Sequence, residues 1–162
     1  MVGGRRTSFG GKLLESVIGA LTLKGLTECP YREYRQHQGD MFDTANERLL
    51  ISNYPYTTIF GTPGRREYYI KSPEWQGELE CKFQNTGGST DEKMLYVAET
   101  LRRGDEDHLV VVHGGDWWED KRGKHIIKWM KRESESLRDQ YGKQLVVLDV
   151  PGFFKWANKT WQ

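Results

Sequence analysis

The pattern of apolar and polar positions predicts helices and strands in turn along the first third of the chain. An apolar stripe at helical spacing from Leu13 to Leu21 predicts a helix that ends near Gly25. Residues 29–38 are polar and aromatic, and we expect a loop followed by a strand there. Residues 43–51 carry capping residues at their start, which favours a short helix.

The middle of the chain has the pattern of an antiparallel meander followed by a helix. Two β-rich runs, 56–60 and 65–70, flank a Gly- and Pro-containing turn and predict a hairpin. Strict alternation over 77–84 predicts the next strand. We expect a helix from Ser89 to Gly104, because Ser89 and Glu92 have the spacing of a capping box.

The last third alternates in the manner of an α/β crossover unit. Continuous apolar runs at 109–112 and 145–150 predict buried strands, with a basic helix between them. Pro151 ends the second strand, and the aromatic residues after it favour a closing helix. We therefore predict one α/β domain over residues 1–162, a mixed central β-sheet with helices on both faces, preceded by a basic arm at 1–10.

Composition supports a soluble intracellular domain. Charged residues make up 29% of the 162 residues and hydrophobic residues 36%, and no apolar run approaches the ~20 residues of a membrane span. The N-terminus lacks the apolar core of a signal peptide. Cys29 and Cys81 have neither a CxxC pair nor companion histidines, so we expect no zinc site and no disulfide framework.

Basic residues are unevenly distributed, although the formal net charge is only +1. The arm contains Arg5 and Arg6, and the predicted basic helix contains six cationic residues without an acidic one. These six are Lys121, Arg122, Lys124, Lys128, Lys131 and Arg132. Both patches are candidate contacts to DNA phosphates, whereas the alternative is a solvated helix face and a terminal arm without function.

Candidate chemistry lies on the polar face of the strand at 77–84. Glu78, Glu80, Lys82 and Gln84 fall on one side of it, opposite Leu79 and its apolar neighbours. Two carboxylates beside an amine can bind a hard divalent cation and position a water or a phosphate. The alternative is a half-buried edge strand whose outer face is only solvated.

Two more carboxylates can approach this face. Glu67 lies on the preceding predicted strand, and twelve residues separate it from Glu80, a length suited to one turn between adjacent strands. Glu15 lies beside the apolar stripe of the first helix, with Gly11 and Gly19 one turn away on either side. Farther along, Trp117 and Trp118 offer either base stacking or a packing cap for the core.

This order of elements resembles the PD-(D/E)xK nuclease superfamily, the restriction-endonuclease-like fold. The matching pieces are the helix with Gly11 to Glu15, an acidic residue on a hairpin strand, and Glu80-Cys81-Lys82 on the next strand, followed by a helix. The family usually has Asp at the first acidic position, where this chain has Glu67 preceded by Arg66. Asp40 is a rival for that position, and Glu78 is a rival for Glu80.

The resemblance implies a role for each matching residue. Glu67, Glu80 and the backbone carbonyl of Cys81 would hold one or two Mg²⁺ ions, for which Mn²⁺ can substitute. Lys82 would orient the attacking water or stabilise charge on the phosphate. Glu15 would act through a metal-bound water, and Gln84 and Lys93 would lie at the rim of the site.

The function that the resemblance implies is Mg²⁺-dependent hydrolysis of phosphodiester bonds in double-stranded DNA. The short chain favours a homing or phage-type endonuclease over a restriction endonuclease or a Holliday-junction resolvase. Double-strand cleavage by single-site subunits would favour a homodimer or a higher oligomer. We expect such a protein in the cytoplasm of a bacterium or of a phage-infected cell. A domain of this fold that binds nucleic acid without cutting it is the alternative from another class.

Overall fold

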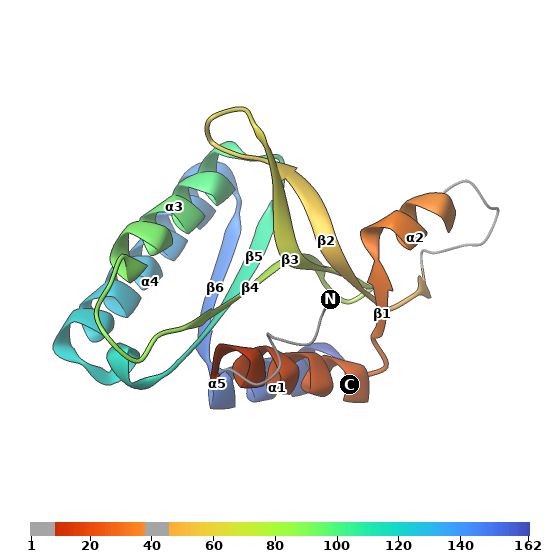
Figure 1. Ribbon diagram of the computed structural model, residues 1–162. Coiled ribbons are helices and arrows are strands. Elements are labelled where there is room, and N and C mark those ends of the chain that lie inside the picture. Colours follow the sequence, from red (N-terminus) through yellow and green to blue (C-terminus); the bar gives the residue numbers. More distant parts are fainter. Residues whose placement is uncertain (1–8, 38–45) are drawn as a thin grey trace.

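A six-stranded sheet forms the centre of the molecule in the computed structural model, which describes residues 9–37 and 46–162 (Figure 1). Each strand pairs with the next strand in the chain. The strands are β1 (Thr27–Pro30), β2 (Leu49–Thr57), β3 (Pro63–Lys71), β4 (Gln76–Phe83), β5 (His108–Gly114) and β6 (Gln144–Asp149).

The sheet is mixed, as the sequence predicted. Pairing is antiparallel from β2 through β3 to β4, and parallel from β4 through β5 to β6. β1 adds to β2 in parallel at the edge. β4 is therefore a central strand, paired on both sides, and Glu78 and Glu80 on it are both buried. This position excludes the interpretation of β4 as an edge strand with a merely solvated outer face.

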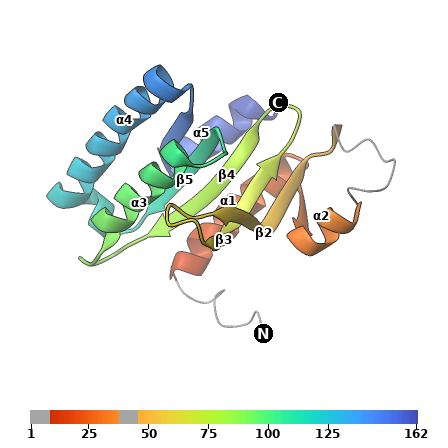
Figure 2. The same cartoon turned by 90° about the horizontal axis from the view of Figure 1, so that it is seen from above.

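Helices cover both faces of the sheet (Figures 1 and 2). They are α1 (Phe9–Leu23), α2 (Tyr31–His37), α3 (Thr90–Arg103), the 3₁₀ helix η2 (Asp116–Glu119), α4 (Lys121–Tyr141) and α5 (Val150–Thr160). Within the described ranges, none of these helices has both the length and the apolar character needed to cross a bilayer.

Each face of the sheet has its own apolar core. α1 and α5 pack on one face, where Val17 and Phe153 contact sheet residues that include Leu79 and Val110. α3 and α4 pack on the other face, where Met94 and Met130 contact Leu109 and Val111. Since side chains of a strand alternate between faces, the apolar residues of β4 point to α1, and Glu80 points to α3.

Three local predictions were wrong. The loop and strand predicted over 29–38 are wrong for residues 29–37, because the strand β1 comes first and α2 begins at Tyr31; residue 38 lies outside the described residues. The helix predicted over 43–51 is wrong for Leu49 to Ile51, which belong to β2 and place Leu50 and Ile51 in the core; residues 43–45 lie outside the described residues. Ser89 precedes α3 as predicted, but its side chain makes no capping hydrogen bond.

An irregularity in the β2–β3 hairpin determines which side chains reach the α3 face. The register pairs Ser52 with Tyr68 and Tyr54 with Arg66 but skips the pair between them, Asn53 and Glu67; the φ of Asn53 is 52°. Tyr68 packs against the core under α1, whereas Arg66, two residues away, reaches the opposite face. Regular alternation would place both side chains on one face, so the alternation of β3 is broken between Arg66 and Tyr68, at the skipped pair.

Candidate active site

An open cleft lies between the central strands and the first half of α3. The strands contribute polar side chains to its floor. The wall is formed by α3 and by Ser89, the residue that precedes this helix. The lining residues are Tyr56, Arg66, Glu80, Lys82, Ser89, Glu92, Lys93, Tyr96 and Val97. The α3 residues recur at three- and four-residue spacing, so one face of the helix is turned toward the strands.

Glu80 and Lys82 form an ion pair within this cleft. They are two residues apart on β4, and their side chains therefore lie on the same face. Nζ of Lys82 is 3.1 Å from Oε2 of Glu80, and the side chains are 29% and 10% exposed, respectively. A largely buried carboxylate thus lies beside an amine that still reaches solvent, as the alternating pattern predicted.

Arg66 lies beneath this pair and contacts both carboxylates of β4. Its Nε is 2.8 Å from Oε2 of Glu78, and its Nη1 is 3.0 Å from Oε1 of Glu80. The guanidinium carbon lies 3.9 Å from the ring centroid of Tyr56, which gives a cation–π contact. The Arg66 side chain is only 3% exposed, and its Nη2 has no hydrogen-bond partner in the described part of the chain.

The charges of this cluster influence one another. Burial alone would lower the pKa of Arg66, but the Glu78 and Glu80 carboxylates outweigh it and hold that pKa above its ordinary value. Burial raises the pKa of Glu78, although Arg66 opposes the shift, and Glu106 raises it further. Arg66 therefore serves as the internal counter-ion of both carboxylates, and both oxygens of Glu80 are engaged, one by Arg66 and one by Lys82.

α3 brings further polar groups to the cleft and connects it to the basic helix. Glu92 and Lys93 are exposed in its first turn, and Tyr96 follows one turn later. Asp91 of the same turn forms an ion pair with Arg122 at the start of α4. The amino-terminal ends of α3 and α4 therefore meet beside the cleft.

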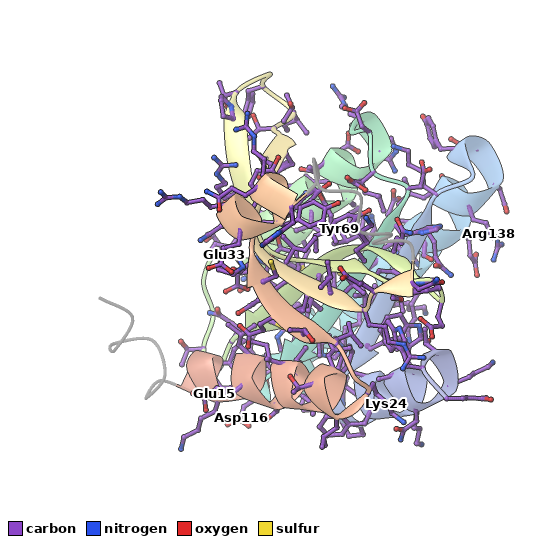
Figure 3. All side chains as sticks on the ribbon, turned by 90° about the vertical axis from the view of Figure 1, so that its right-hand side faces the viewer. Glu15, Lys24, Glu33, Tyr69, Asp116 and Arg138 are labelled. Carbon is purple, nitrogen blue, oxygen red and sulfur yellow. The ribbon has the colours of Figure 1, made fainter. Side chains whose placement is uncertain are left out.

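The structure does not bring every sequence-predicted residue to the cleft. Glu67 is exposed on β3 and is absent from the lining, where its neighbour Arg66 is found instead. Glu15 lies on α1 (Figure 3), the helix that covers the opposite face of the sheet. Gln84 follows β4, and its amide donates a hydrogen bond to the carbonyl oxygen of Thr86, within the loop that leads to α3.

Cys81 and the two tryptophans are core residues. The Cys81 side chain packs against the core under α1, and burial raises the pKa of its thiol, with Glu67 and Glu80 adding to the shift. Trp117 and Trp118 are each 2% exposed and pack in the core under α3 and α4. Of the two alternatives for these tryptophans, the structure supports the packing cap.

The six predicted cationic residues of the basic helix are all exposed on α4. Arg122 is engaged by Asp91. Arg5, Arg6 and Asp40 lie outside the residues that the structure describes.

The side chains that could bind a metal ion are few in the cleft. Across 9–37 and 46–162, no group of three or more His, Cys, Asp or Glu side chains is arranged to hold a metal ion. The cleft does contain two carboxylates, Glu80 and Glu92, and the Ser89 hydroxyl. These are hard oxygen donors, and Mg²⁺ is commonly held by one or two carboxylates together with water and substrate phosphates. The donor set therefore fits such an ion.

Sequence reasoning did not assign six lining residues of the cleft to the site. These are Tyr56, Arg66, Ser89, Glu92, Tyr96 and Val97. Glu92 and Tyr96 carried a usable signal, since they are one helical turn apart from each other on the helix that follows the motif. Arg66 carried none, because strand periodicity places it on the wrong face.

Comparison with known proteins agrees with this geometry. A family model described as a PD-(D/E)XK nuclease superfamily domain matches residues 6–161, almost the whole chain. No curated protein and no solved structure gave a match. The matched region contains the mixed sheet, the helices on both faces and the Glu80-Cys81-Lys82 motif on a central strand. The chain therefore belongs to the PD-(D/E)XK nuclease superfamily, and this membership indicates a nuclease, a hydrolase that acts on nucleic acid.

Proposed function

We propose that this protein is a Mg²⁺-dependent endonuclease that hydrolyses phosphodiester bonds in double-stranded DNA, with homing or phage-type cleavage as its role. The observation that carries the proposal is the Glu80–Lys82 pair, held in an open cleft of a PD-(D/E)XK domain. The pair combines a potential metal ligand with a cation that can meet a phosphate.

Glu80 and Glu92 are the carboxylates that we assign to Mg²⁺, or to Mn²⁺ in its place, with the Cys81 carbonyl as the further ligand that the family resemblance implies. When bound, the ion polarises a phosphoryl oxygen and lowers the pKa of a coordinated water. Glu67, the ligand predicted from sequence, is the alternative to Glu92 as the second carboxylate ligand. Variants of the two residues distinguish between these assignments.

The remaining side chains of the cleft act on the substrate or on Glu80. Lys82 orients the attacking water or stabilises the charge that develops on the phosphate oxygens. Lys93, exposed on the wall of the cleft, contacts a neighbouring phosphate. Arg66 holds the Glu80 carboxylate in position from beneath, so it is a positioning residue.

The exposed cations of α4, together with Arg5 and Arg6, bind the DNA backbone in this proposal. Support comes from the ion pair between Asp91 and Arg122, which connects the start of α4 to the wall of the cleft. One active site cuts one strand, so double-strand cleavage calls for a homodimer. The cytoplasm of a bacterium or of a phage-infected cell is the compartment that this activity favours.

Incubation with supercoiled plasmid tests the proposal. We expect nicked or linear DNA in the presence of Mg²⁺, complete loss of cleavage in EDTA, and loss of cleavage in Lys82→Ala with an unchanged circular dichroism spectrum. Lys155→Ala, a matched change of an exposed lysine on α5, should cut as the wild type does.

A non-cleaving nucleic-acid-binding domain is the second candidate, and one observation favours it. Arg66 and Lys82 already engage both oxygens of Glu80, so a metal ion must compete with two cations for this carboxylate. DNA binding without cleavage under Mg²⁺ or Mn²⁺ would establish this second function. Absence of both binding and cleavage would refute both candidates.

A further inference from the structure

The tip of the β2–β3 hairpin presents an aromatic ring to solvent. Phe60 is 78% exposed, more than any other aromatic side chain whose exposure the structure describes. Hydrogen bonds hold the turn that carries this ring. Thr58 N donates to Thr62 O at 2.9 Å, and the two threonine hydroxyls lie 2.7 Å apart. Gly61 has a φ of 77°, a conformation that glycine adopts without strain. The exposure of Phe60 is therefore built into an ordered turn.

Phe60 lies next to the candidate active site. Its ring centroid is 6.4 Å from that of Tyr96, which lines the cleft together with Glu80 and Lys82. In Figure 1 the hairpin rises beyond the sheet beside α3. Residues of the tip, including Ile59, also line the adjoining hollow along the second half of α3. The exposed ring thus lies at the edge of the groove between the hairpin and α3.

The charges of the hairpin that carries Phe60 suit a polyanion. The hairpin from Thr57 to Arg66 has no acidic side chain, and Arg65 is exposed on it. Lys82 and Lys93 lie in the adjacent cleft beside the two carboxylates assigned to the metal ion, whereas the acidic residues of the adjoining hollow lie on β4 and in the segment that follows α3. A nucleotide presents an anionic phosphate and a flat aromatic base a few ångströms apart, so the combination of cations and one exposed ring matches its chemistry.

We propose that Phe60 stacks on a nucleobase that is unstacked from the duplex, in the strand whose phosphate lies in the cleft, and that Phe60 thereby positions this strand for cleavage. The inference rests on the proposed function, since it requires DNA in the cleft. Base–aromatic stacking tolerates any sequence because every base has a π face. The hairpin therefore contributes affinity and register rather than base identity. The competing occupant is a second copy of this chain, docked through the same ring.

DNA binding in EDTA tests the inference apart from catalysis. A set of short duplexes would each carry 2-aminopurine at one position, and binding would be measured by anisotropy and by 2-aminopurine fluorescence. We expect a fluorescence change at one or two adjacent positions with the wild type. Phe60→Ala should abolish that change and weaken binding about tenfold, the size expected for loss of one stack.

Two further variants separate stacking from other effects. Phe60→Trp should retain affinity and Phe60→Leu should lose it, because leucine is apolar but lacks a π face. Leu23→Ala is the matched control, since Leu23 is 89% exposed at the end of α1, on the other face of the sheet, and this variant should bind as the wild type does.

The outcomes are distinguishable. Equal binding by wild type and Phe60→Ala would overturn the inference and leave the proposed function standing. No DNA binding by the wild type would overturn both. If Phe60→Ala changed the sedimentation coefficient of the protein but left its affinity for DNA unchanged, the ring would be assigned to a contact between copies of the chain. That result would overturn the inference.

Discussion

Nη1 of Arg66 lies 3.0 Å from Oε1 of Glu80, so the hairpin strand is joined to the central acid of the family motif by a buried ion pair. Arg66 also holds Glu78, and Lys82 takes the second oxygen of Glu80. Removing one partner of a buried pair leaves an uncompensated charge, which costs more than the pair itself contributes. The cluster therefore governs both the stability of the sheet and the orientation of Glu80.

Arg66→Met should destabilise the protein by about 3–5 kcal/mol, because Glu78 would remain buried without a counter-ion and Glu80 would keep only Lys82. Urea denaturation followed by circular dichroism measures this loss. Arg48→Met is the matched control: Arg48 pairs with Glu74 at the surface, where the side chains are 31% and 28% exposed, and its loss should cost at most about 1 kcal/mol. Equal stability of Arg66→Met and the wild type would show that the cluster does not stabilise the fold.

Glu92→Gln should raise the Mg²⁺ concentration needed for half-maximal cleavage by about tenfold, because one of the two carboxylates of the cleft is lost. A Mg²⁺ titration of plasmid cleavage measures it. Glu67→Gln is the matched control, since Glu67 is exposed and outside the cleft lining, and its titration should match the wild type. The reverse result would assign the ligand to Glu67, as predicted from sequence.

The periodicity of apolar and polar residues predicted the central strand of the site and the mixed sheet. The alternation over 77–84 placed Glu80 and Lys82 on one face, and the structure confirms their contact. The order of hairpin, strand and crossover helices predicted the mixed sheet, because each of those patterns is local. The family, too, could be recognised from the order of these elements and the Glu80-Cys81-Lys82 motif.

Positions that depend on a break in a pattern could not be predicted. Glu67 was expected near Glu80 because twelve residues separate them, a length suited to one turn between adjacent strands. Arg66 instead reaches the α3 face, because the alternation of β3 is broken at the skipped pair of Asn53 and Glu67, and no local property of residues 65–67 predicts this break. The helix α2 was missed for a different reason: it has seven residues and one buried side chain, Tyr34, too short for a helical stripe.

Neutralising the basic helix should weaken the salt dependence of DNA binding. If Lys124 and Lys128 each contact one phosphate, Lys124→Gln/Lys128→Gln should reduce the slope of log K against log salt concentration by about 2. Anisotropy titrations between low and moderate salt give the slope. Lys155→Gln/Lys159→Gln removes the same charge from exposed positions on α5 and should leave the slope unchanged. Equal slopes for both variants would exclude this part of α4 from the interface.

His113 should make the protein less stable as the pH falls below about 6.5. Its side chain is 7% exposed on β5 and lies 4.9 Å, between ring centroids, from Trp118. Burial lowers the pKa of His113 below its ordinary value, and Lys131 adds to this shift, whereas Asp149 and Glu119 oppose it. The folded state therefore binds fewer protons than the unfolded state as the pH falls through 6.5. Stability is then fully present above that pH and is lost below it, by at most about 1.4 kcal/mol per pH unit.

Urea midpoints at pH 7.5 and 5.5 measure this effect in the wild type and in His113→Gln, which carries no titrating ring. We expect the wild type to lose more stability between the two pH values than the variant does. His125→Gln is the control, because His125 is exposed on α4, and this variant should keep the pH dependence of the wild type. If His113→Gln lost as much stability on acidification as the wild type, the buried ring would not be the group responsible, and the carboxylates around Arg66 would be the next groups to test.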